Sequence, residues 1–349
     1  MDSITPAPGR TAARVVAIAT HVPERVLDNA ELAAIYPEWT AQKIEDKLGI
    51  RERRIAAPDE TASDLAFHAA EKLFGGTGID RAEIDFLIFC TQAPDYILPT
   101  SACLLQTRLG LRTATGAFDI NLGCSGYVYG LAVAAGLIAA GAARSVLLLT
   151  ADTYSKFIHP GDRGIRTLFG DGAAATLIRA AAADEDGASI GPFVFGTDGS
   201  GARALMVETG GARKPRSAET AVATTDATGN VRAPDNLRMN GAGVMSFSLR
   251  AVPPCIDELL AKSGTARDAV DFYVLHQANK FMLDALAKSL KLPPEKLPRR
   301  FAMIGNTVSS SIPFVLEELM SEGRLDPGTS VMVVGFGVGL SWAAGLVDF

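Results

Sequence analysis

Short apolar runs of strand length alternate along this chain with longer stretches in which apolar residues recur every three or four positions. The first pattern is typical of buried β-strands, and the second of amphipathic or buried helices. Clear examples are the runs at 84–93 and 145–152 and the helical stretch at 61–74, which a Thr or Ser cap opens. This regular alternation predicts an α/β architecture with buried sheets.

The second half of the chain repeats the pattern of the first. SIGPFVFGTDG resembles the strand VVAIATHVP, VDFYVLHQAN resembles IDFLIFCTQA, and SVMVVGFGVG resembles SVLLLTAD. The stretch at 304–320, a small-residue turn followed by a helix, matches 122–138 in the same way. Chance alternation is the competing explanation, but four matches in the same order favour an internal duplication.

The duplication predicts a first half over 14–182 and a second half over 186–349, after a loose N-terminal lead-in at 1–13. A polar segment at about 207–241, rich in Gly, Pro, Thr and Arg, interrupts the second half. Its weak periodicity indicates a long surface excursion, which is either a lid over the substrate or a plain solvated insertion.

Composition narrows the classes of function and the expected location. The formal net charge is −6 and no basic tract is present, which argues against a nucleic-acid partner. No apolar run reaches the roughly 18–20 residues of a membrane span, and the N-terminus lacks the apolar core of a signal peptide. The four cysteines form no CxxC pair, which indicates a reducing compartment, so we expect a cytoplasmic protein.

Three residues at the ends of the matched strands are candidates for catalysis. Cys124 follows a strand and opens a helix, where helix N–H groups and the positive end of the dipole favour a nucleophilic thiolate. His276 ends a strand, and Asn306 lies where the duplication places the partner of Cys124. Both can donate a hydrogen bond to a developing oxyanion. Singly, each has a simpler explanation: a packed cysteine, a core histidine and a helix cap.

Together, these segments resemble the 3-oxoacyl-ACP synthase III family of condensing enzymes, in the thiolase superfamily. The resemblance spans residues 14–349 and rests on GIRERRIAAPDETASDLA (49–66), GCSGYVYGL (123–131), DRGIRTLFGDGAAATLI (162–178), HQANKFM (276–282), GNTVSSSIP (305–313) and GFGVGLSW (335–342). It implies a thiolase-like, five-layered αβαβα fold made of two duplicated halves, a homodimer, and no metal or redox cofactor.

The resemblance also implies a mechanism with Cys124, His276 and Asn306 as a catalytic triad. Cys124 takes the acyl group of an acyl-CoA primer, while the backbone amides of Cys124 and Val338 hold the thioester oxyanion. His276 and Asn306 stabilise the enolate that forms when malonyl-ACP, or malonyl-CoA, loses carbon dioxide. A Claisen condensation then gives a 3-oxoacyl thioester, as in fatty acid or secondary-metabolite biosynthesis.

Further positions carry over from the family by motif. Arg163, in the segment DRG, is expected to contact the adenine end of CoA. Phe169 and Phe336 are expected to line the site. Leu98, in YILPTSA, is expected to reach across the dimer and floor the partner's acyl pocket.

Other positions depart from the family pattern. Lys43 stands where the family has a tryptophan that stacks on the adenine of CoA. Phe281, beside Lys280, replaces an arginine that helps dock the acyl carrier protein. The alternative to condensation is a non-decarboxylating acyltransferase on the same fold, which moves the acyl group to an alcohol or amine. A non-catalytic scaffold is the alternative of a different class.

Overall fold

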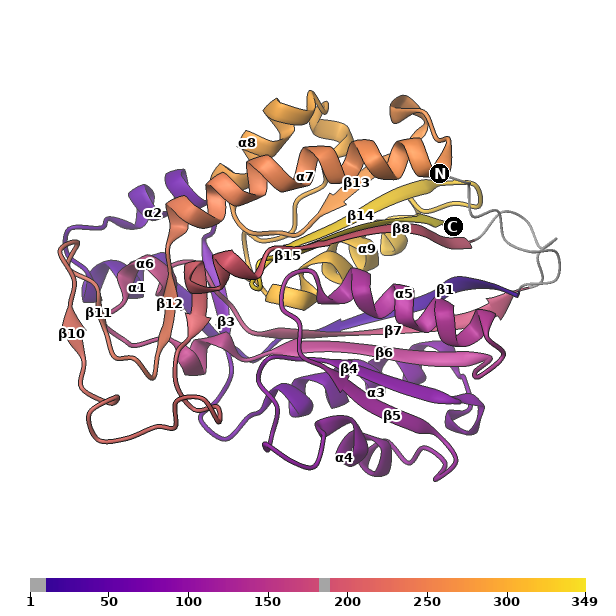
Figure 1. The fold of residues 1–349 in the computed structure, drawn as a ribbon, viewed down its shortest axis with the longest axis horizontal. Coiled ribbons are helices and arrows are strands. Elements are labelled where there is room, and N and C mark those ends of the chain that lie inside the picture. The colour runs from indigo at the N-terminus through magenta and orange to yellow at the C-terminus, as the bar shows by residue number, and fades with distance from the viewer. Residues whose placement is uncertain (1–10, 182–188) are drawn as a thin grey trace.

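The computed structural model describes residues 11–181 and 189–349, which form five layers (Figure 1). Helices α5 (Gly126–Ala139) and α9 (Ser311–Ser321) pack between two β-sheets. Helices α3 (Ala62–Thr77) and α4 (Ser101–Arg108) cover the outer face of one sheet. Helix α7 (Gly241–Ser263), with α8 (Lys280–Leu290) beside it, covers the other. This αβαβα order confirms the expected fold class.

The first sheet has the strand order β1-β7-β6-β4-β5. Strands β4 (Phe86–Cys90), β5 (Gly116–Ile120) and β6 (Ser145–Asp152) run parallel to one another. Strand β7 (Gly172–Ala181) pairs antiparallel with β6 and with β1 (Ala12–His21). Because parallel strands end on the same edge of a sheet, the segments that follow β4, β5 and β6 meet there.

The second sheet has the order β13-β14-β15-β8. Its strands are β8 (Ser189–Thr197), β13 (Phe272–Leu275), β14 (Ser330–Gly337) and β15 (Ser341–Asp348). Strands β8, β13, β14 and β15 occupy the positions that β1, β4, β6 and β7, respectively, hold in the first sheet. The strand order of the first sheet therefore recurs, as the matched segments predict. Within the described residues β5 has no counterpart, because the chain before Asn306 forms turns rather than a strand.

Two of the expected boundaries need comment. Strand β1 already begins at Ala12, so the last two residues of the expected lead-in at 1–13 belong to the sheet. Residues 1–10 of that lead-in, and the expected junction between the halves near 182–186, lie outside the described residues.

The polar segment at 207–241 contains short strands. A hairpin pairs β10 (Thr224–Thr225) with β11 (Val231–Arg232), and β9 (Leu205–Val207) pairs with β12 (Leu237–Met239) at its base. The remaining elements are the paired strands β2 (Arg25–Asp28) and β3 (Glu52–Ile55), helices α1 (Asn29–Ile35), α2 (Ala41–Leu48) and α6 (Arg163–Arg166), and single 3-10 turns.

Helix α5 is apolar around its whole circumference, as suits a helix packed between two sheets, although Gly136 and Ala139 near its end are exposed. It carries no charged residue, and Gly130 lets the side chain of Leu148 in β6 approach closely, since a Cβ there would lie 2.6 Å from it. Among the described residues, no helix combines the length and the hydropathy that crossing a bilayer requires.

Candidate active site

Cys124 lies in the turn between β5 and α5, with its side chain buried. Ser125 is the N-cap of α5, so Cys124 stands one residue before the cap. The end of β14 passes directly over the thiol, because a Cβ atom built on Gly337 would lie 2.9 Å from its Sγ. The bare backbone of GFGVG therefore approaches Cys124 closely, as its composition suggests, and a side chain at Gly337 would displace the sulfur.

The environment of Cys124 favours a protonated thiol. Its pKa is raised to about 12, first by burial and then by the nearby carboxyl of Asp152. The backbone N–H groups of Cys124 and Val338 hydrogen-bond the sulfur and act in the opposite direction. Burial of the thiol therefore opposes the thiolate that the sequence predicts near neutral pH, because lost solvation outweighs the amide donors. The same two amides point at the reacting atom.

His276 follows β13, is buried, and is held in one orientation. Its Nδ1 lies 2.7 Å from Oγ of Ser311, which also accepts a 3.2 Å hydrogen bond from the backbone N–H of Gln277. The ring of Phe336 meets the imidazole edge to face, with ring centroids 5.6 Å apart. Burial lowers the pKa of His276 to about 3, so the imidazole is neutral at pH 7. With Nδ1 beside Ser311, Nε2 is the nitrogen that faces Asn306, and the ring also hydrogen-bonds the backbone of Val308.

Asn306 is clamped on both sides of its backbone. Its N–H donates to the carbonyl of Leu168 and its carbonyl accepts from the N–H of Gly170, each at 3.0 Å. Its Oδ1 accepts a 2.9 Å hydrogen bond from the N–H of Val308, which leaves Nδ2 3.5 Å from Nε2 of His276. Two nitrogens are therefore placed to donate to a single oxygen atom between them.

The turn after Asn306 is strained. Val308 is buried and has a φ of 54°, a conformation that β-branched residues rarely adopt. Strain of this kind costs about 1–3 kcal/mol and persists where the surroundings impose it. Here it serves the orientation of the Asn306 carboxamide, because the N–H that fixes Oδ1 belongs to Val308.

A buried carboxyl lies behind Cys124. Asp152 accepts hydrogen bonds of 2.8 Å from the N–H of Gln92 and from Oγ of Ser309. Burial raises its pKa to about 7, against the effect of these donors. The Gln92 side chain continues the network, accepting from the Tyr154 hydroxyl and donating to Asn121. A polar cluster thus reaches from the end of β6 to the loop that carries Cys124.

Phe336 and Phe169 lie close to this group, as expected. Phe336 contacts His276 as described, and Phe169 is buried with its ring 5.1 Å from that of Tyr154. A backbone bridge joins Phe169 to Asn306. Leu98 is different: it is 79% exposed, and its neighbours Tyr96 and Ile97 are exposed as well.

Arg163, the residue expected at the adenine of CoA, begins α6 beside the β10–β11 hairpin. Its guanidinium pairs with Glu38 and donates to the carbonyl of Thr228 in that hairpin. The hairpin is tied down further, since Arg232 pairs at 3.0 Å with the buried Asp162. The polar insertion therefore covers Arg163, the expected contact of the CoA nucleotide. The sequence alone left open whether this insertion is a lid or a solvated loop.

The two expected lysines are exposed. Nζ of Lys43 lies 5.6 Å from the ring centroid of Trp39, whose other neighbour is Lys47. Lys280 pairs at 2.8 Å with Asp284 on the same helix. Neither residue contacts the buried group around Cys124.

Two residues of the site escaped the sequence reasoning. Ser311, which orients His276, is the last of three consecutive serines after Asn306, and the first helical residue of α9. A polar run at the start of a largely apolar helix was the available signal. Asp152 ends a strand of apolar residues, and a carboxyl at the buried end of a parallel strand was the corresponding signal. No cluster of His, Cys, Asp or Glu that could hold a metal occurs among the described residues.

Comparison with known proteins gives a consistent result. Residues 118–199 match the family model described as 3-oxoacyl-[acyl-carrier-protein] synthase III, and residues 260–349 match the model of its C-terminal part. The beta-ketoacyl-[acyl-carrier-protein] synthase III of Chlamydia caviae is 37% identical over 336 residues, covering 95% of each chain. That of Caldanaerobacter subterraneus is 33% identical and covers 97% of this chain and 98% of its own.

Solved structures agree. A crystal structure of a 3-oxoacyl-(acyl-carrier-protein) synthase III superposes with a TM-score of 0.94 and 57% identity, covering 97% of this chain and all of its own. The 3-oxoacyl-(acyl carrier protein) synthase of Burkholderia xenovorans gives 0.88 and 37%, covering 97% and 94%. The priming beta-ketosynthase of a polyketide pathway gives 0.84 and 30%, covering 99% and 98%.

Proposed function

The chain belongs to the 3-oxoacyl-ACP synthase III family, and we propose that Cys124, His276 and Asn306 perform the reaction of that family. The enzyme is an acyltransferase that condenses an acyl-CoA primer with malonyl-ACP, with loss of carbon dioxide, to give a 3-oxoacyl-ACP. The observation that carries the residue assignment is the presence of two donor pairs: the amides of Cys124 and Val338 on the sulfur, and Nε2 of His276 beside Nδ2 of Asn306.

The first step is transfer of the primer to Cys124. Sγ attacks the thioester carbonyl of the acyl-CoA, the carbon–sulfur bond to CoA breaks, and the thiol proton leaves with the CoA thiolate. Because the resting thiol is protonated, this proton has to move as the bond forms. The amides of Cys124 and Val338 hold the oxyanion of the tetrahedral intermediate, and removal of one such donor typically costs about 10²–10³ in rate.

The second step is decarboxylation and condensation. The malonyl thioester oxygen binds between Nε2 of His276 and Nδ2 of Asn306. The carbon–carbon bond to the carboxylate breaks, carbon dioxide leaves, and the electron pair becomes an enolate held by both donors. Its carbon attacks the acyl-enzyme, the bond to Sγ breaks, and Cys124 leaves as a thiolate that takes up a proton from water. A neutral imidazole suits this role, since the pair stabilises negative charge by donating rather than by titrating.

The surfaces that receive the substrates follow from the expected positions. We place the nucleotide end of CoA near Arg163 and the nearby lysines Lys43 and Lys47, which requires the Arg163–Glu38 pair to open or to be bridged. We place the acyl carrier protein near Lys280 and the basic residues Arg299 and Arg300, with the exposed Phe281 among them. Lys280 and Arg299 share the carboxylate of Asp284, and Arg300 pairs with Glu318, so the patch around Phe281 keeps part of its positive charge for an acidic carrier helix.

We also propose a homodimer and a cytoplasmic location. The exposed run Tyr96–Leu98 is an apolar projection on a loop, which on a protein surface marks a contact with another chain. The four cysteines are all unpaired, as expected in a reducing compartment.

The test is intact-protein mass spectrometry after incubation with a panel of acyl-CoAs. A gain of one acyl group is expected in the wild type and in Cys103→Ala, whose exposed thiol is the matched control, and none in Cys124→Ala. Loading of Cys124→Ala to the wild-type extent would refute the assignment of the nucleophile.

The acyl-enzyme then separates condensation from simple transfer. Malonyl-ACP should discharge Cys124 with one carbon dioxide released per acyl group, and His276→Ala or Asn306→Ala should retain acylation but release little carbon dioxide. Discharge by alcohols or amines without carbon dioxide would instead support the non-decarboxylating alternative, which the family assignment does not favour.

A further inference from the structure

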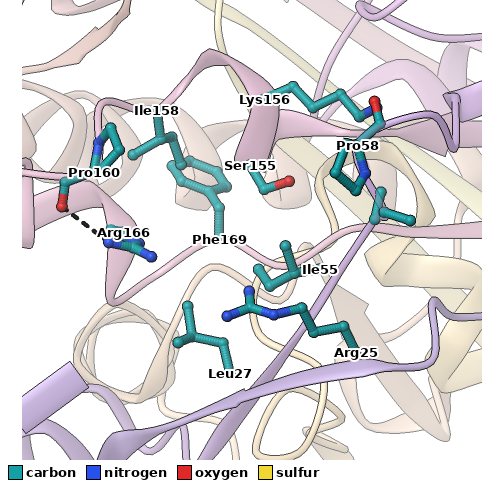
Figure 2. Close-up of a pocket in the computed structure, with 12 residues that line it drawn as sticks. Arg25, Leu27, Ile55, Pro58, Ser155, Lys156, Ile158, Pro160, Arg166 and Phe169 are labelled. Carbon is teal, nitrogen blue, oxygen red and sulfur yellow. Dashed lines mark hydrogen bonds between the residues drawn. The ribbon is translucent and has the colours of Figure 1, made fainter. Parts of the chain in front are cut away.

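A pocket of about 390 Å³ lies against Phe169, outside the buried group of Cys124, His276 and Asn306 (Figure 2). Its floor is apolar and buried, formed by Leu27, Ala56, Ile158 and Phe169. Three cationic side chains, Arg25, Lys156 and Arg166, stand around it. The volume falls in the range of small-molecule sites, roughly 300–1,000 Å³.

The cations around this pocket are only partly neutralised, by Glu31 beside Arg25 and by the buried Asp171, whose charge interacts with Lys156. Lys156 donates at 2.9 Å to the carbonyl of Pro58, and Arg166 donates at 3.0 Å to the carbonyl of Pro160. Within the described residues neither forms an ion pair, and Arg25 pairs only with Glu31 at an exposed position. A carboxyl behind the wall, Asp171, is buried and held by Ser155 and by the N–H of Ala56.

From this arrangement we infer that the pocket binds an aliphatic carboxylate, with its chain on the apolar floor and its head group at Arg166 and Arg25, while Lys156 adds positive charge at the other side of the pocket. The cations select an anion, and the floor selects a chain rather than a compact ion. A neutral chain would leave the cations unused, and inorganic phosphate would leave the floor unused. The inference does not depend on the proposed catalytic roles.

The position of the pocket suggests that an occupant would be sensed by the active site. Phe169 forms part of the floor, and the next residue, Gly170, donates to the backbone carbonyl of Asn306. There is no room for adjustment at that point, since a Cβ on Gly170 would collide with the carbonyl of Ile304. A ligand that shifts Phe169 would therefore move the backbone that clamps Asn306.

The test is isothermal titration of the full chain with straight-chain carboxylates of six, eight and ten carbons. Each buried CH₂ contributes about 0.8 kcal/mol, so each two-carbon step should tighten Kd roughly 15-fold. Decanol and inorganic phosphate should bind at least ~10-fold more weakly than decanoate. Equal binding by decanol, or by phosphate, would overturn the inference, because the cations or the floor would then contribute nothing.

Variants locate the binding. Arg166→Gln should weaken decanoate about ten-fold, the loss of one charge-assisted hydrogen bond, while Arg144→Gln, exposed at the far end of β6, should leave it unchanged. The titration is repeated after alkylation of Cys124 with iodoacetamide. An unchanged Kd in Arg166→Gln would refute the site at Arg166, and loss of binding on alkylation would place the carboxylate in the catalytic centre instead.

Discussion

Replacing Asp152 with asparagine should stabilise the protein at neutral pH. In the fold, burial raises the pKa of this carboxyl from its ordinary 3.8 to about 7. The unfolded chain gives up the proton from pH 3.8 upward, whereas the native protein keeps it until about pH 7. The native state therefore loses stability between those values, and above pH 7 the penalty is constant. A pKa difference of about three corresponds to about 4 kcal/mol.

The asparagine of the Asp152→Asn variant keeps the shape of the side chain without its charge. Its oxygen can still accept from the N–H of Gln92, and its amide can donate to Oγ of Ser309, which donates in the wild type. Imperfect hydrogen-bond geometry costs about 1 kcal/mol. The net gain should be about 3 kcal/mol at pH 8 and close to zero or slightly negative near pH 4.

The assay is urea-induced unfolding of both proteins at about pH 4.5, 6 and 8. Asp64→Asn is a control of opposite sign. Burial acts to raise the pKa of Asp64, but hydrogen bonds from Thr61 and Arg108 outweigh it and lower that pKa. The Asp64→Asn substitution should therefore lower the free energy of unfolding most above about pH 4. Removing the Asp152 charge should also lower the pKa of Cys124, which alkylation rates report. A variant equally destabilised at the lowest and highest pH would refute the reasoning, since the buried carboxylate would then carry no penalty.

Four further outcomes are expected. Ser311→Ala should slow carbon dioxide release roughly ten- to a hundred-fold, which is less than the effect of deleting a donor. Acylation of Cys124, followed by mass spectrometry, should stay unchanged. An equal loss of carbon dioxide release and of acylation would argue against a role through His276. Gly337→Ala should abolish acylation of Cys124, because the new Cβ would collide with the Cys124 sulfur. Unfolding of the variant is monitored to check that it still folds. The wild type should lose about 2 kcal/mol of stability between pH 6.5 and pH 5, since in that range only the unfolded chain binds a proton on His276. His276→Gln should remove this loss. Leu98→Glu should shift the mass by light scattering towards a monomer, and an unchanged mass would remove Leu98 from the interface.

The fold was within reach of the sequence because it depends on repeated local patterns. Apolar runs and capped helices predict the α/β class, and the match of 270–279 with 84–93 places β13 where β4 stands. The positions of Cys124, His276 and Asn306 could be singled out because they lie in segments that match between the two halves. The protonation state of Cys124 could not be predicted from the sequence. Its thiol loses solvation because Gly337, which is distant in the sequence, passes over it. The contact of Arg163 with the β10–β11 hairpin likewise joins residues that are far apart in the sequence.

The duplication also divides the candidate site between the two halves. The match of VDFYVLHQAN with IDFLIFCTQA places His276 opposite Cys90, and the turns before α5 and α9 place Cys124 opposite Asn306. Cys90 donates to the carbonyl of Leu122 and touches Gly126, so its position is used for packing rather than chemistry. On the proposed assignment, the first half supplies the nucleophile Cys124 and the second half supplies the neutral donors His276 and Asn306. Since α5 and α9 are buried only when both sheets are present, the contact that forms the core also assembles the site.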